Sequence, residues 1–168
     1  MRTLIPVLAL VLVTSAAPSS AQQRKSPHAQ TSVTIDGKTI SVEYGRPSVK
    51  GRAIFGALVP YGDVWRTGAD EATTLTTTAD LMLGSLHVPA GTYSLFTIPG
   101  ERQWTLVLNK NAKQWGAFDY DAGQDLGRAP MTVESLSSPV EQLTIDLTNG
   151  KLSISWAKTK ASVEMLVH

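Results

Sequence analysis

The segment L143-T-I-D-L-T-N-G-K-L-S-I-S-W156 decides the fold, because it specifies a turn and a strand register together. Asn149-Gly150 between two alternating runs is the strongest short signal for a β-hairpin with a type I′ turn, in which both central residues have positive φ. That turn places apolar residues opposite one another in three pairs: Leu147 with Leu152, Ile145 with Ile154, and Leu143 with Trp156. A slip of one residue would turn this apolar set outward. The segment therefore predicts an antiparallel hairpin with one buried face.

Two other turns give the same agreement between pattern and register. Asp36-Gly37 joins two alternating runs within residues 31–44, and Gly84-Ser85 suits a type II′ turn within residues 81–88. The expected cross-strand pairs are Val33 with Ile40, Thr34 with Thr39, Ser32 with Ser41, Leu83 with Leu86, and Leu81 with Val88. We therefore expect hairpins at all three places.

Further strands are expected at residues 73–78, 92–98, 103–108 and 161–167, where β-branched or alternating apolar residues lie between turns. Helical spacing is not evident after the first 21 residues, although residues 53–58 could form one short turn of helix. Many short strands at close spacing predict an all-β protein. We expect an antiparallel β-sandwich of the jelly-roll kind, with a closed barrel as the alternative.

Residues 1–21 have the features of a secretory signal peptide: an early positive charge, a short apolar run, and the small residues Ser19 and Ala21 before a cleavage site. The apolar run is shorter than the roughly 20 residues of a membrane-spanning helix. We expect residues 22–168 to form one β-sandwich domain, exported to the periplasm or outside the cell, without stable membrane insertion. The chain has no cysteine, so burial alone must hold this domain together.

The charge balance and the motifs exclude several kinds of partner and cofactor. Removing residues 1–21 takes away only Arg2 of the 15 Lys and Arg residues, and the remaining 14 match the 14 Asp and Glu residues. A neutral chain offers little attraction to nucleic acid, so none is expected as a partner. The three histidines are far apart, and Gly123 interrupts the acidic run at residues 119–125, so we expect no metal or other cofactor. The chain has no G-x-S-x-G motif, so the sequence does not indicate a nucleophilic enzyme.

A long connection at residues 45–70 separates the first expected hairpin from the strand at 73–78. Connections of this length inside a compact domain are uncommon and often functional. This one carries many apolar side chains, which would be unfavourably hydrated if left in water. We expect a partly ordered loop that folds as a lid over one open end of the sandwich.

Six motifs carry a resemblance to a known family: S26-P-H-A29, Y44-G-R-P-S-V-K-G-R52, I54-F-G-A-L-V-P-Y-G62, V64-W-R-T-G-A-D-E-A-T73, A90-G-T-Y-S-L-F96 and Q114-W-G-A-F-D-Y120. Together the motifs resemble a family of exported bacterial proteins catalogued as domain of unknown function 2911, over essentially the whole mature chain. The resemblance implies an exported, mostly β domain and supplies no reaction. The chain departs from the family pattern at Asp70, where members have Asn.

The stretch from Trp65 to Glu71 contains the first candidate site residues. The Arg66 guanidinium can donate two parallel hydrogen bonds to a carboxylate, and Glu71 or Asp70 is the near partner across Gly68. One interpretation is a structural ion pair that fixes the lid to the following strand. The other is a pocket under the lid, lined by Arg66 and Glu71, with Trp65 as one wall.

Further candidates lie in two other loops. Arg46 and Arg52, with Lys50 between them, could bind a carboxylate or phosphate, or could belong to a solvated turn. Trp115, helped by Tyr120, could stack on a sugar ring or could plug a corner of the sandwich. Trp104 and Trp156 are in phase with strand interiors, and we expect both in the core.

These observations favour an exported protein that binds a small polar or saccharide-like ligand near residues 45–73. One alternative is a structural or assembly module, in which the motif is only a folding core. The other is a hydrolase of cell-envelope glycan that uses Glu71 with a second acid. Asp70 is a poor second acid, since neighbouring strand residues point to opposite faces. The sequence does not indicate an oligomeric state.

Overall fold

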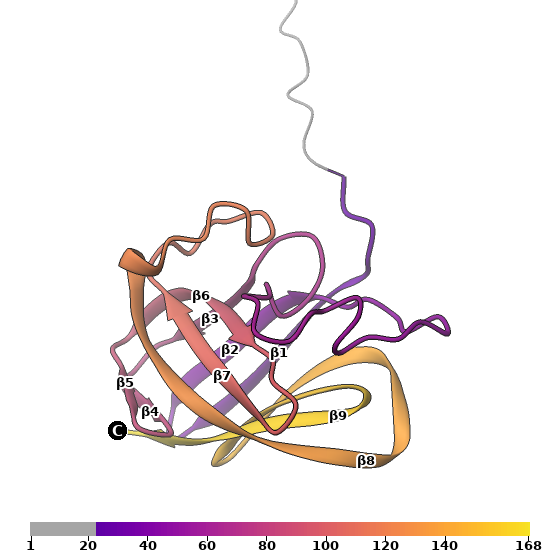
Figure 1. The fold of residues 1–168 in the computed structure, drawn as a ribbon. Helices are drawn as coiled ribbons and strands as arrows, with labels where there is room; N and C mark the ends of the chain where they lie inside the picture. The colour runs from indigo at the N-terminus through magenta and orange to yellow at the C-terminus, as the bar shows by residue number, and fades with distance from the viewer. Residues whose placement is uncertain (1–22) are drawn as a thin grey trace, which may run out of the picture.

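The computed structural model describes residues 23–168, which form nine strands joined in one antiparallel sheet (Figure 1). The order across the sheet is β1-β2-β3-β6-β7-β8-β9-β4-β5. The strands are β1 (His28–Ile35), β2 (Lys38–Gly45), β3 (Thr73–Thr77), β4 (Leu81–Leu83), β5 (Leu86–Val88), β6 (Gly91–Ile98), β7 (Gln103–Asn109), β8 (Asp125–Thr148) and β9 (Lys151–Val167). The prediction of an antiparallel all-β fold is confirmed. The expected signal peptide lies outside the described residues.

The long hairpin of β8 and β9 gives the sheet its sandwich-like form. Between the pairs Val140–Ala157 and Thr144–Ser155, β8 has three residues where β9 has only Trp156. This bulge, together with a φ of 51° at Ala157, folds the hairpin back on itself. The carbonyl of Gly150 at its tip accepts a hydrogen bond of 2.9 Å from the backbone N–H of Met165. Within residues 23–168 no ladder joins β1 to β5, so the sheet does not close into a barrel.

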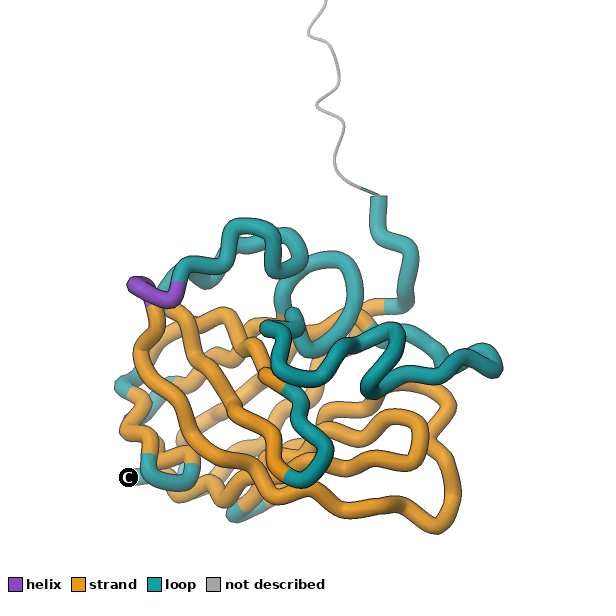
Figure 2. The backbone as a smooth tube through the Cα atoms, in the orientation of Figure 1, coloured by secondary structure: helices purple, strands orange, loops and turns teal. Residues whose placement is uncertain are grey.

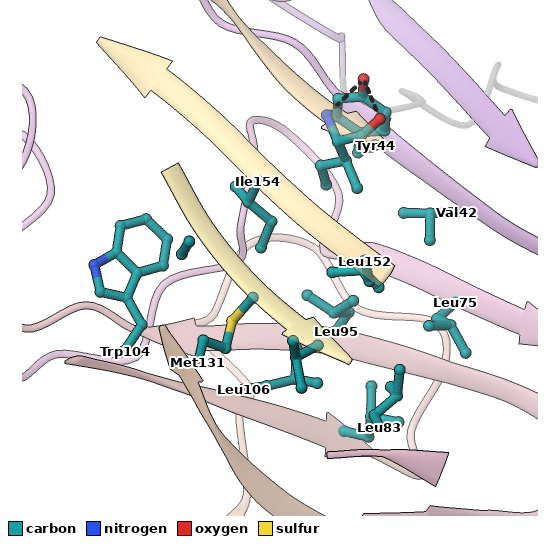
Figure 3. Packing of buried hydrophobic residues seen from close by; sticks show 14 of the residues in the cluster. Val42, Tyr44, Leu75, Leu83, Leu95, Trp104, Leu106, Met131, Leu152 and Ile154 are labelled. Carbon is teal, nitrogen blue, oxygen red and sulfur yellow. Dashed lines mark hydrogen bonds between the residues drawn. The ribbon is translucent and has the colours of Figure 1, made fainter. Parts of the chain in front are cut away.

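The core lies between the folded hairpin and the layer formed by β2, β3, β6 and β7 (Figure 3). Its fully buried side chains come from both layers and include Ile40, Val42, Leu75, Leu95, Trp104, Leu106, Leu152 and Ile154. Each buried aliphatic side chain of this size stabilises the fold by about 1.5–3 kcal/mol relative to exposure. Trp104 and Trp156 are 1% and 2% exposed, which confirms their expected place in the core.

The three predicted hairpins are present, with one error in register and one in turn type. The ladders contain the predicted pairs of β1–β2 and β4–β5, and Leu147–Leu152 and Ile145–Ile154 of β8–β9. Leu143 and Trp156 do not pair directly, because the bulge in β8 falls there. Asn149 lacks the positive φ that a type I′ turn requires, and only Gly150 has it. The reason is tertiary, since the Gly150 carbonyl is turned toward Met165.

Two further local features differ from the predictions. The first half of β8, up to about residue 142, was not predicted as a strand. Residues 53–58 form hydrogen-bonded turns around a bridge between Phe55 and Val59, not a helical turn. The only helical segment in the described part is the 3₁₀ turn η1 (Ala122–Gln124), and no helix there is long and apolar enough to cross a membrane.

The connection at residues 45–70, here called the lid, follows a defined path over one end of the core (Figure 2). It begins along the edge of β8, where the backbone N–H of Val49 donates to the carbonyl of Glu141 at 2.8 Å. It ends against β6, where Trp65 and Thr97 exchange backbone hydrogen bonds of 2.8 and 3.0 Å. The expected lid over one end of the sandwich is therefore present.

Two aromatic side chains of the lid insert into the core. Phe55 packs edge-on against Trp104 with ring centroids 4.8 Å apart, and Trp65 stacks on Trp156 at 6.0 Å. Aromatic pairs in these arrangements contribute about 0.5–1.5 kcal/mol beyond the area they bury. The lid is thus part of the hydrophobic core and not a loose cover.

Candidate functional site

The first described residues form a segment that docks onto the end of the lid; residues 24–28 are here called the strap. The Asp70 carboxylate accepts hydrogen bonds from the backbone N–H groups of Lys25 and Ser26, with shortest distances of 3.0 Å. The Glu71 carboxylate contacts Arg24 Nε at 2.7 Å through one oxygen and His28 Nε2 at 2.9 Å through the other. The two adjacent acids therefore hold the strap in place.

The environment of Glu71 keeps it ionised. Partial burial raises the pKa of Glu71, but hydrogen bonds from the backbone, from Arg24 and from His28 together lower it below its ordinary value of 4.5. A general acid in glycoside cleavage needs a raised pKa, and its partner carboxylate needs an oxygen free to attack or to accept a proton. Both oxygens of Glu71 are occupied, and Asp70 already accepts two backbone hydrogen bonds. These two acids are not arranged for hydrolysis.

The predicted ion pair between Arg66 and Glu71 or Asp70 is wrong. Arg66 makes no ion pair within residues 23–168, and its Nε is buried without a hydrogen-bond partner there. The reason lies in the short segment that follows Gly68. It pairs with the next long loop through Ala72 N–H to Gln114 carbonyl and Gly116 N–H to Asp70 carbonyl, each at 3.0 Å. This pairing directs Glu71 to the strap, away from Arg66.

Arg66 lines a cavity of about 380 Å³ between the lid and the strap, here called the lid pocket. Four cationic residues line it: Lys25, Lys50, Arg52 and Arg66. Its one acidic residue, Asp70, is occupied by the strap backbone, and Trp65 and Trp156 supply apolar wall. The lid pocket therefore has an excess of positive charge and an aromatic side.

A second cavity of about 360 Å³ lies over the outer face of β2 and β3, here called the sheet-face pocket. Glu43 and Thr74, which oppose each other across β2 and β3, contribute to it, with His28 and Glu71 beside them. Trp115 forms part of its wall. The two pockets share no lining residue, and the strap contributes to both.

Five of the seven predicted site residues line one of the two pockets, and the other two line neither. Arg52, Trp65 and Arg66 line the lid pocket, whereas Glu71 and Trp115 line the sheet-face pocket. Arg46 and Tyr120 line neither pocket.

Arg46 and Tyr120 have structural contacts instead. Arg46 Nε donates to the carbonyl of Leu143 at 2.8 Å, which fixes the start of the lid to β8. Tyr120 donates to Asp125 at 2.7 Å and accepts from Arg128 at 3.0 Å. Burial, and then the Asp125 carboxylate, raise the pKa of this phenol. Within the described residues no group of three or more His, Cys, Asp or Glu is placed to hold a metal ion.

The comparisons with known proteins give a family for the chain. A family model described as protein of unknown function (DUF2911) matches residues 26–165. The chain belongs to this family. No curated protein and no solved structure matches it. In this DUF2911 member the whole lid, and every pocket residue from Ser26 onward, lies within the matched region.

Sequence reasoning missed several pocket residues of this DUF2911 protein. Lys25, Ser26 and His28 were missed because the strap docks partly through backbone N–H groups, which carry no signature in the sequence. Glu43 gave no signal because it is an exposed strand residue, and Gln114, a buried loop amide, appeared only as the first residue of the family motif at 114–120. For the strap, the S26-P-H-A29 motif was the one available indication of a fixed position.

Proposed function

We propose that this DUF2911 protein is exported and binds a small acidic ligand, a carboxylate or a phosphate, in the lid pocket. The observation that carries the proposal is Arg66, whose guanidinium has no acidic partner in the described part of the chain. Its Nε is buried without a hydrogen bond. Such groups are rare in folded proteins and call for an explanation. A ligand anion beside the remaining N–H groups of Arg66 supplies the acidic partner that its guanidinium lacks among the described residues.

The surroundings of Arg66 favour an anion over a neutral ligand. Arg52 is held by its own loop, with Nη2 donating to the Ser48 carbonyl at 2.6 Å and Nε to the Val49 carbonyl at 3.0 Å. Lys25 and Lys50 add two ammonium groups at the same cavity. Charge-assisted hydrogen bonds from such groups to a carboxylate or phosphate are about twice as strong as neutral ones.

The size of the lid pocket limits the ligand to a small molecule. A volume of about 380 Å³ lies at the lower end of the range for small-molecule sites. Trp65 and Trp156 offer apolar surface next to the cations. The best fit is a compact acid with a short apolar part, and the role is binding, because no described group there is arranged for chemistry.

A thermal-shift titration tests the proposal. The mature chain is titrated with inorganic phosphate, citrate and short-chain carboxylic acids, and a bound ligand must raise the melting temperature by mass action. Arg66→Met should fold and bind about 10- to 100-fold more weakly, since a hydrogen bond to a charged group contributes about 1.5–3 kcal/mol. Arg102→Met, which removes an exposed arginine from the β6–β7 turn, is the matched control and should bind normally.

Two results would overturn the proposal. One is that none of these anions stabilises the wild-type chain. The other is that Arg66→Met unfolds the protein while wild type binds nothing, as expected for a purely structural motif. Export is tested separately by mass spectrometry of the protein recovered outside the cytoplasm. Its mass should correspond to a chain that begins near residue 22.

A further inference from the structure

Trp115 differs from the other three tryptophans of the protein. Trp65, Trp104 and Trp156 belong to one aromatic cluster in the core. Trp115 is half-buried, lies in neither hydrophobic cluster, and makes no ring contact with another aromatic side chain in the described part of the chain. Trp115 instead forms part of the wall of the sheet-face pocket. A large aromatic side chain in this position offers an apolar surface to a ligand.

The backbone around Trp115 is fixed, so the wall is preformed. Trp115 forms a bridge with Glu71, flanked by the hydrogen bonds of Gln114 with Ala72 and of Gly116 with Asp70, each of 3.0 Å. Both sides of this bridge belong to segments that are tied to the rest of the fold. Preformed sites bind with a smaller loss of conformational entropy than mobile loops do.

Polar side chains occupy the sheet side of the same cavity. Glu43 and Thr74 are opposite each other on neighbouring strands, next to the pair of buried core residues Val42 and Leu75. Their side chains therefore project to the outer face, where His28 also lines the cavity. Together these residues provide hydrogen-bond donors and acceptors opposite an aromatic wall.

The charges of the sheet-face pocket favour a neutral ligand. Glu71 is occupied on both oxygens by Arg24 and His28. Among the described residues no ion pair engages Glu43 or Lys113, so one free anion and one free cation remain. Gln114, 8% exposed, has a buried Oε1 with no hydrogen-bond donor. Gln114 Oε1 needs a hydrogen-bond donor, and a carboxylate or phosphate anion would bring only further acceptors.

We propose that the sheet-face pocket is a second binding site, separate from the lid pocket, and that it takes a neutral saccharide. The apolar face of a sugar ring packs on Trp115, and its hydroxyl groups exchange hydrogen bonds with Glu43, Thr74 and His28. The cavity of about 360 Å³ has room for one or two sugar rings.

Tryptophan fluorescence tests this site, because Trp115 is the most accessible of the four fluorophores. The mature chain is titrated with glucose, galactose, N-acetylglucosamine, cellobiose and lactose. At least one of them should change the emission saturably. Because replacing Trp115 removes this fluorophore, the variants are compared with wild type by isothermal titration calorimetry, in which Trp115→Ala should bind that sugar at least about tenfold more weakly. Trp115→Phe, which keeps an aromatic face, should weaken binding by no more than about threefold.

Two control variants show whether the sugar binds at Trp115 or elsewhere on the protein. Phe118→Ala removes an aromatic side chain that is 84% exposed in the same loop and lines neither pocket, so it should bind as wild type does. Arg66→Met, which disables the lid pocket, should also leave sugar binding unchanged. If Trp115→Ala does not fold, Glu43→Gln provides the test, and it should weaken sugar binding at an unchanged melting temperature.

The proposal is overturned if none of the five sugars binds, or if Trp115→Ala binds as tightly as wild type. Equal loss of sugar binding in Arg66→Met and Trp115→Ala would also overturn it, since that result places the sugar in the lid pocket. Failure of wild type to bind any of the anions, with sugar binding intact, would count against the lid pocket only.

Discussion

A single hydroxyl group joins the two layers of the sandwich at Tyr44. The phenol, 3% exposed, accepts a hydrogen bond of 3.0 Å from the backbone N–H of Ile145 and donates one of 3.4 Å to the carbonyl of the same residue (Figure 3). These contacts occupy polar groups of β8 that lie inside the core. Buried backbone groups are nearly always paired in this way.

Replacing Tyr44 by Phe keeps the ring and removes these hydrogen bonds. The N–H of Ile145 is then buried without a partner, so we expect the free energy of unfolding to fall by about 1–3 kcal/mol. Urea denaturation measures the change. Tyr61→Phe is the control, because Tyr61 is 42% exposed, and it should have little effect. Equal stability of the Tyr44 variant and wild type would show that water replaces the hydroxyl.

At the same scale, Arg66 shows what sequence proximity can and cannot predict. The sequence left two interpretations open, an ion pair and a pocket under the lid, and Arg66 and Trp65 do line a cavity there, whereas Glu71 does not. The prediction failed for the partner, because the direction of Glu71 depends on a bridge to Trp115, a loop residue more than 40 positions away. The Glu71 carboxylate instead contacts Arg24 and His28 of the strap, and no spacing pattern in the sequence predicted these two contacts.

Among the elements, the end of β2 and the end of the lid meet backbone to backbone. A Cβ atom built on Gly45 would lie 2.2 Å from the carbonyl oxygen of Ala69, and one on Gly68 would lie 2.9 Å from the carbonyl oxygen of Gly45. Neither obstacle is a flexible side chain. Glycine at these two positions therefore sets the distance between the sheet and the residues that hold the strap.

Gly45→Ala should force these two segments apart. We expect a loss of about 3 kcal/mol of stability, at the upper end of the usual cost of overpacking. Differential scanning calorimetry measures the shift in melting temperature. Gly123→Ala is the control, since the added methyl would meet only the Asp121 side chain at 3.1 Å, and it should change stability much less. A Gly45 variant as stable as this control would mean that the backbone contact relaxes freely.

The strap should make stability depend on pH through Glu71. Because the pKa of Glu71 is lowered in the folded state, its stabilising contribution is present above the ordinary value of 4.5 and is lost as pH falls through the folded value. Its side chain is 32% exposed, so we expect Glu71→Gln to cost no more than about 1 kcal/mol at pH 7.

Denaturation midpoints of wild type and Glu71→Gln between pH 3 and 7 test this dependence. The difference between the two proteins should shrink as pH falls below 4.5, because the wild-type carboxylate is progressively protonated. Glu43→Gln, on β2 and without an ion pair in the described residues, is the control for loss of a carboxylate. A Glu71 difference that stayed constant from pH 7 to pH 3 would mean that shape, not charge, holds the strap.

The strands differ in how far the sequence could predict them. The pairs of β1–β2 and β4–β5 followed from a turn and an alternating pattern that agreed, and both are local. The first half of β8 was missed because most of its side chains from residue 125 to 142 are exposed or half-buried, so alternation is weak. Its pairing with β7 is visible only once the sheet is assembled.

For the whole molecule, the sequence predicted the class of fold but not the order of the sheet. β4 follows β3 along the chain but pairs with the last residues of β9, as in Leu81 with Val167. No local pattern distinguishes this arrangement from pairing with β3. The same assembly brings the lid, the loop that contains Trp115 and the strap to one end of the sheet (Figure 2). Residues of these three segments line the two pockets.

The pairing of β4 with the end of β9 bears on how the protein is made. More than 75 residues separate Leu83 from its partner Met165, so the sheet cannot be completed before nearly the whole chain has left the ribosome. Until then the β4–β5 hairpin has no further strand beside β4, and unpaired edges of this kind favour aggregation. The sheet of a nascent chain of this protein therefore stays incomplete, with an open edge, until β9 has been synthesised.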